Sequence, residues 1–375
     1  MKARPRTHGP PGTRLRLRLL ALAAALLSGP AAARAHLAYG AEGLRELAAR
    51  CDLAVVVEFE GPRRQGRAGD GSQSHEVFPV KVLSTLFGVA PSPHLEITSH
   101  AEGSPGFAAG ERALLFLEHL ASPLERAGSF SLASLQDPRQ EWRLGPHGDE
   151  LVAVVREYLA LRGAQGSEGT ARFRAILLRE LRAADPRLRE DALREWIRLG
   201  RAPLLQDPGE MAPFAALVPA LPVAEGIVLA GLLERQGGFE PAPHLLALTG
   251  QPLAPGERAA LTRAAGRSRD PRLSRWLAGE LGDPDPLVRR DAAAALGEPW
   301  HGQQVPALAA ATGDPDERVA RAALRALAQI GSEPARAVLQ DAAASGVEPI
   351  RRFAAAELRR ASLEGGLPPP APGTR

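Results

Sequence analysis

Three arginines recur at a fixed interval near the C-terminal end of the chain. Arg290, Arg321 and Arg352 are each 31 residues apart. A guanidinium group binds a carboxylate through two parallel hydrogen bonds, so this row predicts a surface that grips acidic groups of a partner. The alternative is an ordinary solvated helix face, because almost every basic residue of the chain is arginine and only Lys2 and Lys81 are lysine.

The sequence offers little for catalysis or metal binding. It contains no HExxH, GxSxG or P-loop motif. Its single cysteine excludes an intramolecular disulfide and a cysteine-based metal site. His75 and Glu76 form a lone pair in a predicted loop, and the helical half holds only His147, His244 and His301. We therefore expect no enzyme, cofactor or metal, although a Ser/His/Asp arrangement assembled in space stays open.

A 31-residue repeat predicts the helices that carry the arginine row. Val288, Val319 and Ile350 recur at this interval, and in each unit an alanine and a leucine follow four and eight residues later. These positions share one face of a helix, which we expect to be buried. Each arginine of the row lies two residues after the β-branched position, about 200° round the helix, and therefore points to solvent. The alanines are Ala292, Ala323 and Ala354, and the leucines are Leu296, Leu327 and Leu358.

Asp-Pro pairs mark the predicted helix starts. Asp314 followed by Pro315 predicts an N-cap aspartate with proline at the first helical position. Similar starts occur at other acidic residues, and the period blurs between about 200 and 270. They lie at Asp185, Asp207, Asp270, Asp283 and Glu348.

The stretch from Asp283 to Gly297 resembles the second helix of HEAT repeats, with its DPxxxVRxxAxxALG pattern. The resemblance implies an α-solenoid of stacked helix pairs over 149–362. In the family an aspartate and an arginine tie neighbouring repeats, and Ala320 stands where arginine is usual. The equivalent residues here are Asp283 with Arg289, Asp314, and Arg351. The second helices of such a stack line its concave surface, so the resemblance places the arginine row there and implies a protein partner.

The N-terminal half, 44–148, has short strand-like runs. Five strands are expected at 52–60, 77–83, 94–98, 113–117 and 129–133, with a mobile loop at 63–75. The runs at 51–57, 78–88, 95–98 and 110–117 resemble the OB-like β-barrel of secreted netrin and TIMP-type proteins, which implies a small barrel. Metalloprotease inhibitors of this type need an N-terminal cysteine and several disulfides. The only cysteine, Cys51, is not at the expected mature N-terminus, so inhibition is not carried over.

Residues 1–35 have the order of a secretory signal peptide. Seven basic residues accompany the apolar run from Leu19 to Leu27, and Ala33-Arg34-Ala35 offers a cleavage site. We expect export to the periplasm or outside the cell, without stable membrane insertion after cleavage. The rest of the chain has more acidic than basic residues, which argues against nucleic-acid binding. The proline-rich end, 363–375, is expected to be disordered.

These patterns predict a multidomain protein, a small OB-like β-barrel followed by a HEAT-like α-α superhelix. Trp196, Trp276 and Trp300 are expected in the helical core rather than on a binding surface. The predicted function is non-catalytic binding or scaffolding of a protein partner. Two alternatives stay open: a HEAT-like lyase or enzyme accessory, and an inhibitor-like β-barrel module.

Overall fold

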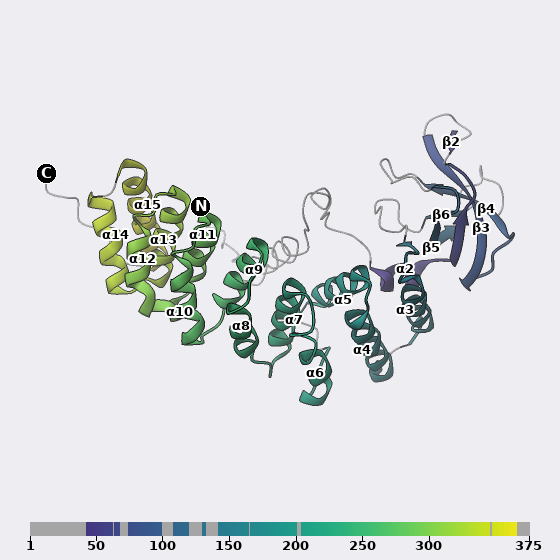
Figure 1. Ribbon diagram of the computed structural model, residues 1–375, viewed down its shortest axis with the longest axis horizontal. Helices are drawn as coiled ribbons and strands as arrows, with labels where there is room; N and C mark the ends of the chain where they lie inside the picture. The colour runs from purple at the N-terminus through teal and green to yellow at the C-terminus, as the bar shows by residue number, and fades with distance from the viewer. Residues whose placement is uncertain are drawn as a thin grey trace, which may run out of the picture. The chain divides into compact units, whose positions relative to one another are not determined.

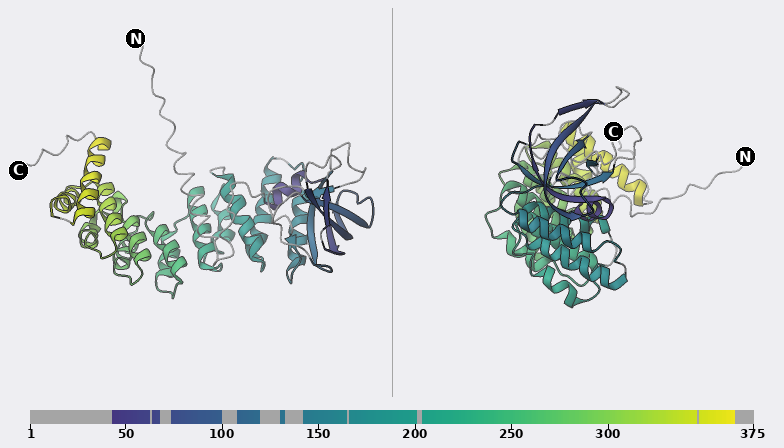
Figure 2. Two further views of the ribbon diagram at one scale, coloured as in Figure 1. Left: turned by 90° about the horizontal axis from the view of Figure 1, so that it is seen from above. Right: turned by 90° about the vertical axis from the view of Figure 1, so that its right-hand side faces the viewer.

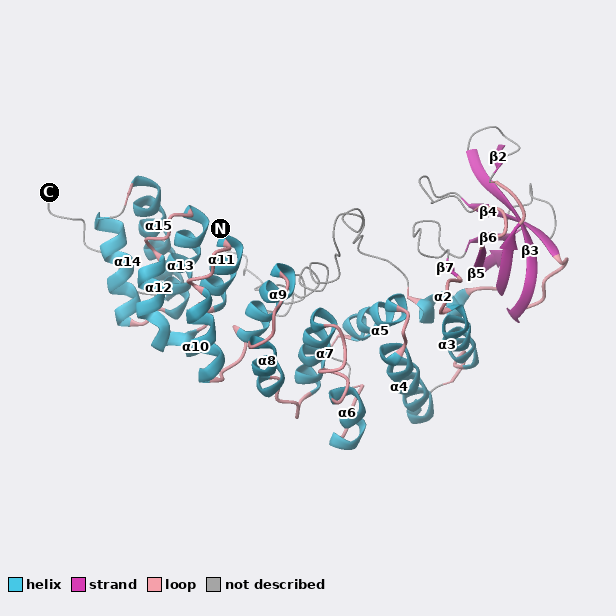
Figure 3. Ribbon diagram, viewed as in Figure 1, coloured by secondary structure: helices cyan, strands magenta, loops and turns pink. Residues whose placement is uncertain are grey.

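The computed structural model describes residues 43–62, 64–67, 74–99, 108–119, 130–132, 142–164, 166–200, 204–345 and 347–365 (Figure 1). The expected signal peptide lies outside them, as do residues 366–375 of the predicted tail. The chain forms two compact units that divide after Leu204. All described strands belong to the first unit, and the described part of the second is helical (Figure 3). No helix in the described ranges combines the length and apolarity needed to cross a membrane.

The first unit contains all five predicted strands and two more. In β1 and β5 buried apolar residues follow one another without interruption, whereas in β3 and β4 buried residues alternate with more exposed ones. Val55, Phe78, Ile97 and Leu115 from these four strands meet in one core. The additional strands are β2, which lies in the expected loop and pairs with β3, and the two-residue β7. The strands are β1 (Leu53–Phe59), β2 (Arg64–Arg67), β3 (Ser74–Phe87), β4 (His94–Ser99), β5 (Arg112–His119), β6 (Phe130–Leu132) and β7 (Trp142–Arg143).

These strands form one seven-stranded, mainly antiparallel sheet, in which six strands follow the order β1-β3-β4-β6-β5-β7 and β2 pairs with β3. β1 also pairs with β5, so the sheet curls back on itself. The link through β6 is narrow, because this three-residue strand meets β4 over only two residue pairs, Ile97 with Phe130 and Thr98 with Ser131. The expected closed barrel is therefore not formed; the sheet is curled but not closed.

The described part of the first unit begins with a helix, in a region where the sequence predicted only strands. α2 (Leu44–Arg50) packs against α3 (Gly148–Ala160), which is followed by α4 (Gly166–Arg182) and α5 (Pro186–Leu199). The backbone N–H of Leu44 donates to the Asp191 carboxylate at 3.2 Å. Arg162 donates to the carbonyl oxygens of Ala48 and Cys51 at 3.0 and 2.8 Å. Side chains distant in sequence thus satisfy both ends of this short helix.

The second unit consists of paired helices, as the repeat predicted. α7, α9, α11, α13 and α15 pack on one another in succession, and α8, α10, α12 and α14 accompany them. Figure 2 shows these helices, coloured from teal-green to yellow, from two further directions. The helices are α6 (Pro208–Ala215), α7 (Val223–Gln236), α8 (Ala242–Thr249), α9 (Pro255–Ala265), α10 (Pro271–Glu280), α11 (Pro286–Ala295), α12 (Val305–Ala311), α13 (Glu317–Ile330), α14 (Glu333–Ser345) and α15 (Glu348–Gly365), with a 3₁₀ helix at Pro299–Gln304.

The repeated apolar positions form the core of the second unit. Val288, Val319 and Ile350 are buried, and so are the three alanines four residues later. Leu296 and Leu327 are fully buried, while Leu358, near the end of α15, is partly buried against the same core. The predicted buried helix face is confirmed. Because α11, α13 and α15 carry this face at the same 31-residue interval, they pack on one another in succession.

Candidate binding surface

The arginine row lies at equivalent positions on α11, α13 and α15. The side chains of Arg290, Arg321 and Arg352 are 41%, 47% and 79% exposed. Each also has a carboxylate partner: Arg290 donates to Asp291 at 2.6 Å, Arg321 pairs with Glu317, and Arg352 pairs with Glu348. The row is therefore solvent-accessible, and its guanidinium groups are held by local ion pairs.

Two further arginines extend this surface. Arg263 on α9 donates to the same Asp291 carboxylate at 2.7 Å. On α13, Arg325 and Arg321 both lie over the Phe353 ring, each 5.4 Å from its centroid. The sequence contains a signal for Arg263 and Arg325, because the two residues are separated by twice the repeat length. We name Arg263, Arg290, Arg321, Arg325 and Arg352 together the arginine face.

The predicted repeat-stacking residues are only partly brought together. Arg289 donates to both carboxylate oxygens of Asp314, at 2.7 and 2.9 Å, and both side chains are largely buried. Asp283 does not pair with Arg289 through its carboxylate; it accepts from Arg258 at 2.8 Å. Arg258 precedes Arg289 by one repeat, so the Arg258–Asp283 and Arg289–Asp314 pairs are equivalent steps of one ladder.

The ladder ends after two steps. Ala320, one repeat beyond Arg289, is buried and has no charge to offer. Arg351, one repeat further, pairs with Glu348 of its own helix and not with an aspartate of a neighbouring repeat.

The residues that stack the repeats are not the ones that cap the helices. Asp285 and Asp316, two positions after Asp283 and Asp314, are the N-caps of α11 and α13. The predicted N-cap at Asp314 is therefore wrong. Its carboxylate is occupied by Arg289 and by the backbone N–H of Asp316 at 2.8 Å. The Arg289 side chain, through its hydrogen bonds, lowers the pKa of Asp314.

The tryptophans and His301 are mainly structural. Trp196 is fully buried, and Trp276 is partly buried against the core. Trp300 is the exception to the core prediction, because it is exposed and stacks with Arg269 at 5.3 Å. His301 is buried, with its Nε2 2.9 Å from the Gly266 carbonyl oxygen and its Nδ1 2.6 Å from the Ser274 hydroxyl. Both ring nitrogens are thus occupied, which suits a packed neutral imidazole.

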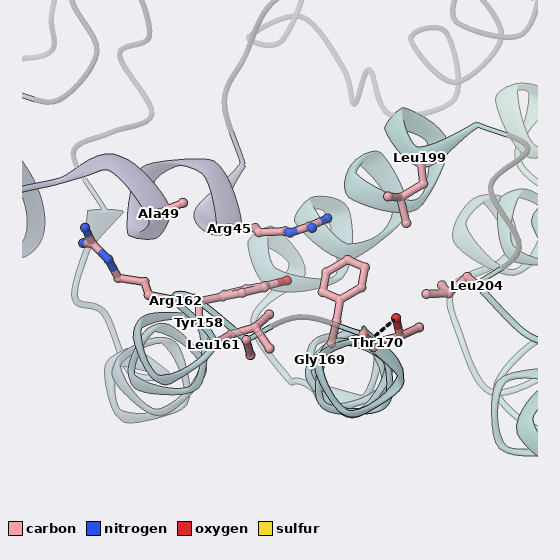
Figure 4. A pocket seen from close by; sticks show the side chains of 13 residues that line it. Arg45, Ala49, Tyr158, Leu161, Arg162, Gly169, Thr170, Leu199 and Leu204 are labelled. Atoms are coloured by element: carbon pink, nitrogen blue, oxygen red, sulfur yellow. Dashed lines mark hydrogen bonds between the residues drawn. The ribbon is translucent and has the colours of Figure 1, made fainter.

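A pocket that the sequence analysis missed lies in the first unit, between α2, α3, α4 and the end of α5 (Figure 4). Its volume is about 420 Å³. Tyr158 and Phe173 provide aromatic walls, and the Arg45 guanidinium lies 4.4 Å from the Phe173 ring centroid. Under the pocket, the Tyr158 hydroxyl donates to the buried Glu180 carboxylate at 2.9 Å.

Within the described ranges no group of three or more His, Cys, Asp or Glu side chains is arranged to hold a metal ion. Cys51 is buried, and burial raises the pKa of its thiol to about 11. A thiol with this pKa is almost entirely uncharged at neutral pH and is therefore a poor nucleophile or metal ligand.

The residues 274–359 match the family model of HEAT repeats, from within α10 to within α15. The match spans the arginine row and the Arg289–Asp314 pair. A search of curated proteins finds no match. HEAT repeats commonly mediate protein–protein interaction, and the matched segment is the part of the chain where the repeat is most regular.

Proposed function

We propose that this chain is an exported, non-catalytic binding protein whose helical repeats hold an acidic segment of a partner protein on the arginine face. The observation that carries the proposal is the placement of five guanidinium groups on four successively packed helices, α9, α11, α13 and α15. Export is proposed from the leader sequence, and the HEAT-repeat match supports a partner of protein nature.

The acids within the arginine face leave capacity for a partner. A guanidinium group carries five N–H donors. Arg290 uses two of its nitrogens on Asp291, and Arg325 uses its Nε on Glu357 at 3.4 Å. The local carboxylates restrict the arginine rotamers, so a bound carboxylate pays less of the ordering entropy that free surface arginines would require. The Arg321–Glu317 and Arg352–Glu348 pairs are exposed on both sides and contribute little stability, so these two arginines can exchange their partner for a bound carboxylate.

We further infer that the sheet of the first unit is an OB-like module. Its strand order supports this inference, because β6 crosses over to lie between β4 and β5 and pairs with β4 in parallel. A partly open five-stranded Greek-key arrangement of this kind is typical of OB-folds.

The test is partner capture by the full chain in its native host. A tagged protein is cross-linked in the exported fraction beside an Arg290→Glu, Arg321→Glu, Arg352→Glu variant. The matched control is Arg156→Glu, Arg172→Glu, Arg275→Glu, which makes the same charge change at three exposed positions outside the arginine face.

We expect one abundant acidic partner that the control retains and the arginine-face variant loses, with binding that weakens as salt concentration rises. If the leader is removed on export, the tagged chain purified from the exported fraction should have the intact mass of a protein that begins at His36. Equal capture by both variants, or no enriched partner with the unaltered chain, would contradict binding on the arginine face.

A further inference from the structure

The pocket of the first unit has one apolar side and one cationic side. The Tyr158 and Phe173 rings lie 6.5 Å apart at an angle of 47°, and Leu161, Leu199 and Leu204 complete the apolar lining. Figure 4 shows the Arg45 side chain reaching across the pocket above Tyr158. The Arg45 guanidinium lies 4.4 Å from the Phe173 ring centroid. A pocket of about 420 Å³ falls in the size range that takes small organic groups.

The charge of the lining selects the sign of the ligand. Among the lining residues that the structure describes, Arg45 and Arg162 are the only ionisable side chains apart from Tyr158, and none is acidic. Arg45 donates through one terminal nitrogen to Glu195 at 3.0 Å. Arg162 donates through one terminal nitrogen to the carbonyl oxygens at the end of α2. The same nitrogen of Arg162 lies 3.8 Å from the Cys51 Sγ, and the Arg162 guanidinium lies over the Phe87 ring, 4.1 Å from its centroid. Arg45 uses only one of its nitrogens on Glu195, so it is the guanidinium group that offers donors to an anion in the pocket.

The pocket walls are held in place before any ligand arrives. Tyr158 is buried and fixed by its hydrogen bond to Glu180. Burial, aided by the nearby Asp191 carboxylate, raises the pKa of Glu180 well above its ordinary value. Glu195, at 5% side-chain exposure, holds the Arg45 guanidinium through an ion pair at 3.0 Å. Such preorganisation lowers the entropy cost of binding.

We propose that this pocket binds an apolar carboxylate, with the carboxylate paired to Arg45 and the aromatic or branched aliphatic body against Tyr158, Phe173 and Leu204. Two sources supply this chemistry: a small carboxylic acid, and the free C-terminal residue of a protein that ends in an apolar side chain. The site lies on α2 to α5 of the first unit and is independent of the arginine face in the second.

Calorimetric titration of the full chain with three probes tests the proposal and separates the sources. The probes are 3-phenylpropionate, the peptide Ala-Ala-Phe with a free C-terminus, and the same peptide amidated. We expect the amidated peptide to bind at least about tenfold more weakly than the free one, because it lacks the charge that Arg45 recognises. Binding of 3-phenylpropionate alone assigns the site to small acids, and binding of the free peptide alone assigns it to a protein C-terminus.

Two variants tie the binding to the pocket. Arg45→Gln should weaken the free probes by about tenfold or more, and the control Arg172→Gln, an exposed arginine of α4 outside the lining, should leave them unchanged. Ala49→Phe places a ring at the exposed pocket rim on α2 and should block binding without changing the melting temperature. The proposal is overturned if free and amidated peptides bind equally, if no probe binds, or if both folded variants bind as the unaltered chain does.

Discussion

At the scale of single residues, aspartates two positions apart divide two tasks. Asp283 and Asp314 accept an arginine from the preceding repeat, while Asp285 and Asp316 cap the helices. Hydrogen bonds from the Arg318 side chain and backbone lower the pKa of Asp316 to about 2. The pKa of Asp314 is lowered as well, so Asp314 and Asp316 stay ionised through the physiological range, and the stacking and capping contacts of α13 persist together.

The buried imidazole of His301 should make the second unit less stable in acid. Burial lowers the pKa of its imidazole below the ordinary 6.5. As the pH falls below about 6.5, the unfolded chain takes up a proton that the folded chain resists, so this residue reduces stability from there downward. Melting temperatures at pH 7.5, 6.5 and 5.5 should fall more steeply for the unaltered chain than for His301→Gln, whose amide does not titrate.

Other groups titrate identically in both chains of that comparison, so only the difference between the two curves reports on His301. Parallel curves over this range would show that His301 keeps its ordinary pKa in the folded state. Above pH 7.5 the variant should be the less stable chain, since its amide replaces an imidazole that is bonded at both nitrogens.

At the scale of elements, close approach of successive helices depends on small residues at the helix ends. A Cβ added to Gly266, directly after α9, would lie 2.7 Å from the Ala295 Cβ and 2.9 Å from the Ala295 carbonyl oxygen on α11. Gly297 follows Gly266 by one repeat, and a Cβ added to it would lie 3.2 Å from the Ala326 Cα of α13. Gly266 and Gly297 thus set the distance between repeats.

We therefore expect Gly266→Ala to lower the free energy of unfolding by about 1–3 kcal/mol, because the methyl group forces α9 and α11 apart. The matched control is Gly279→Ala in α10, where the added Cβ meets nothing within 4 Å apart from its chain neighbours and the backbone of its own helix. There alanine should raise stability by about 0.5–1 kcal/mol through its lower unfolded-state entropy. Urea unfolding of both variants measures the contrast. A Gly266→Ala protein as stable as the control variant would refute the spacing role.

At the scale of the whole molecule, the first unit joins the sheet to four helices. Leu44 and Leu47 of α2 are buried, and Arg187 of α5 donates to the Arg143 carbonyl oxygen of β7 at 3.0 Å. Trp142 of β7 lies under the same Arg187 guanidinium, 5.6 Å away. The sheet therefore packs against α2 through β5 and contacts α5 through Arg187, and α2 in turn packs on α3.

This packing predicts which fragments fold. Residues 36–204 should give a cooperative thermal transition, because they retain the Leu44–Asp191 and Arg187–Arg143 contacts. Residues 36–148 should be poorly folded, because α2 loses the surface that covers its apolar side and both helix-end partners. Circular dichroism melts and amide hydrogen exchange compare the two. A shorter fragment that melts cooperatively at the same temperature would show that the sheet is autonomous.

The sequence by itself determined whatever depends on local periodicity. The 31-residue spacing of Val288, Val319 and Ile350 predicted stacked helices with one buried face, because a helix places every fourth residue on the same side. The uninterrupted apolar run of β5 predicted a buried strand, again from neighbouring residues alone. Both features depend only on residues that are close together in the sequence.

Only the tertiary structure decided what depends on contacts between distant segments. Sequence spacing could not choose between Asp314 and Asp316 as the cap, because Arg289 of the preceding repeat occupies Asp314. It could not reveal α2, since seven residues form a stable helix only when Asp191 and Arg162 satisfy its ends. The pocket of Arg45, Tyr158 and Phe173 escaped prediction as well, because more than a hundred residues separate Arg45 from the two aromatic residues along the chain.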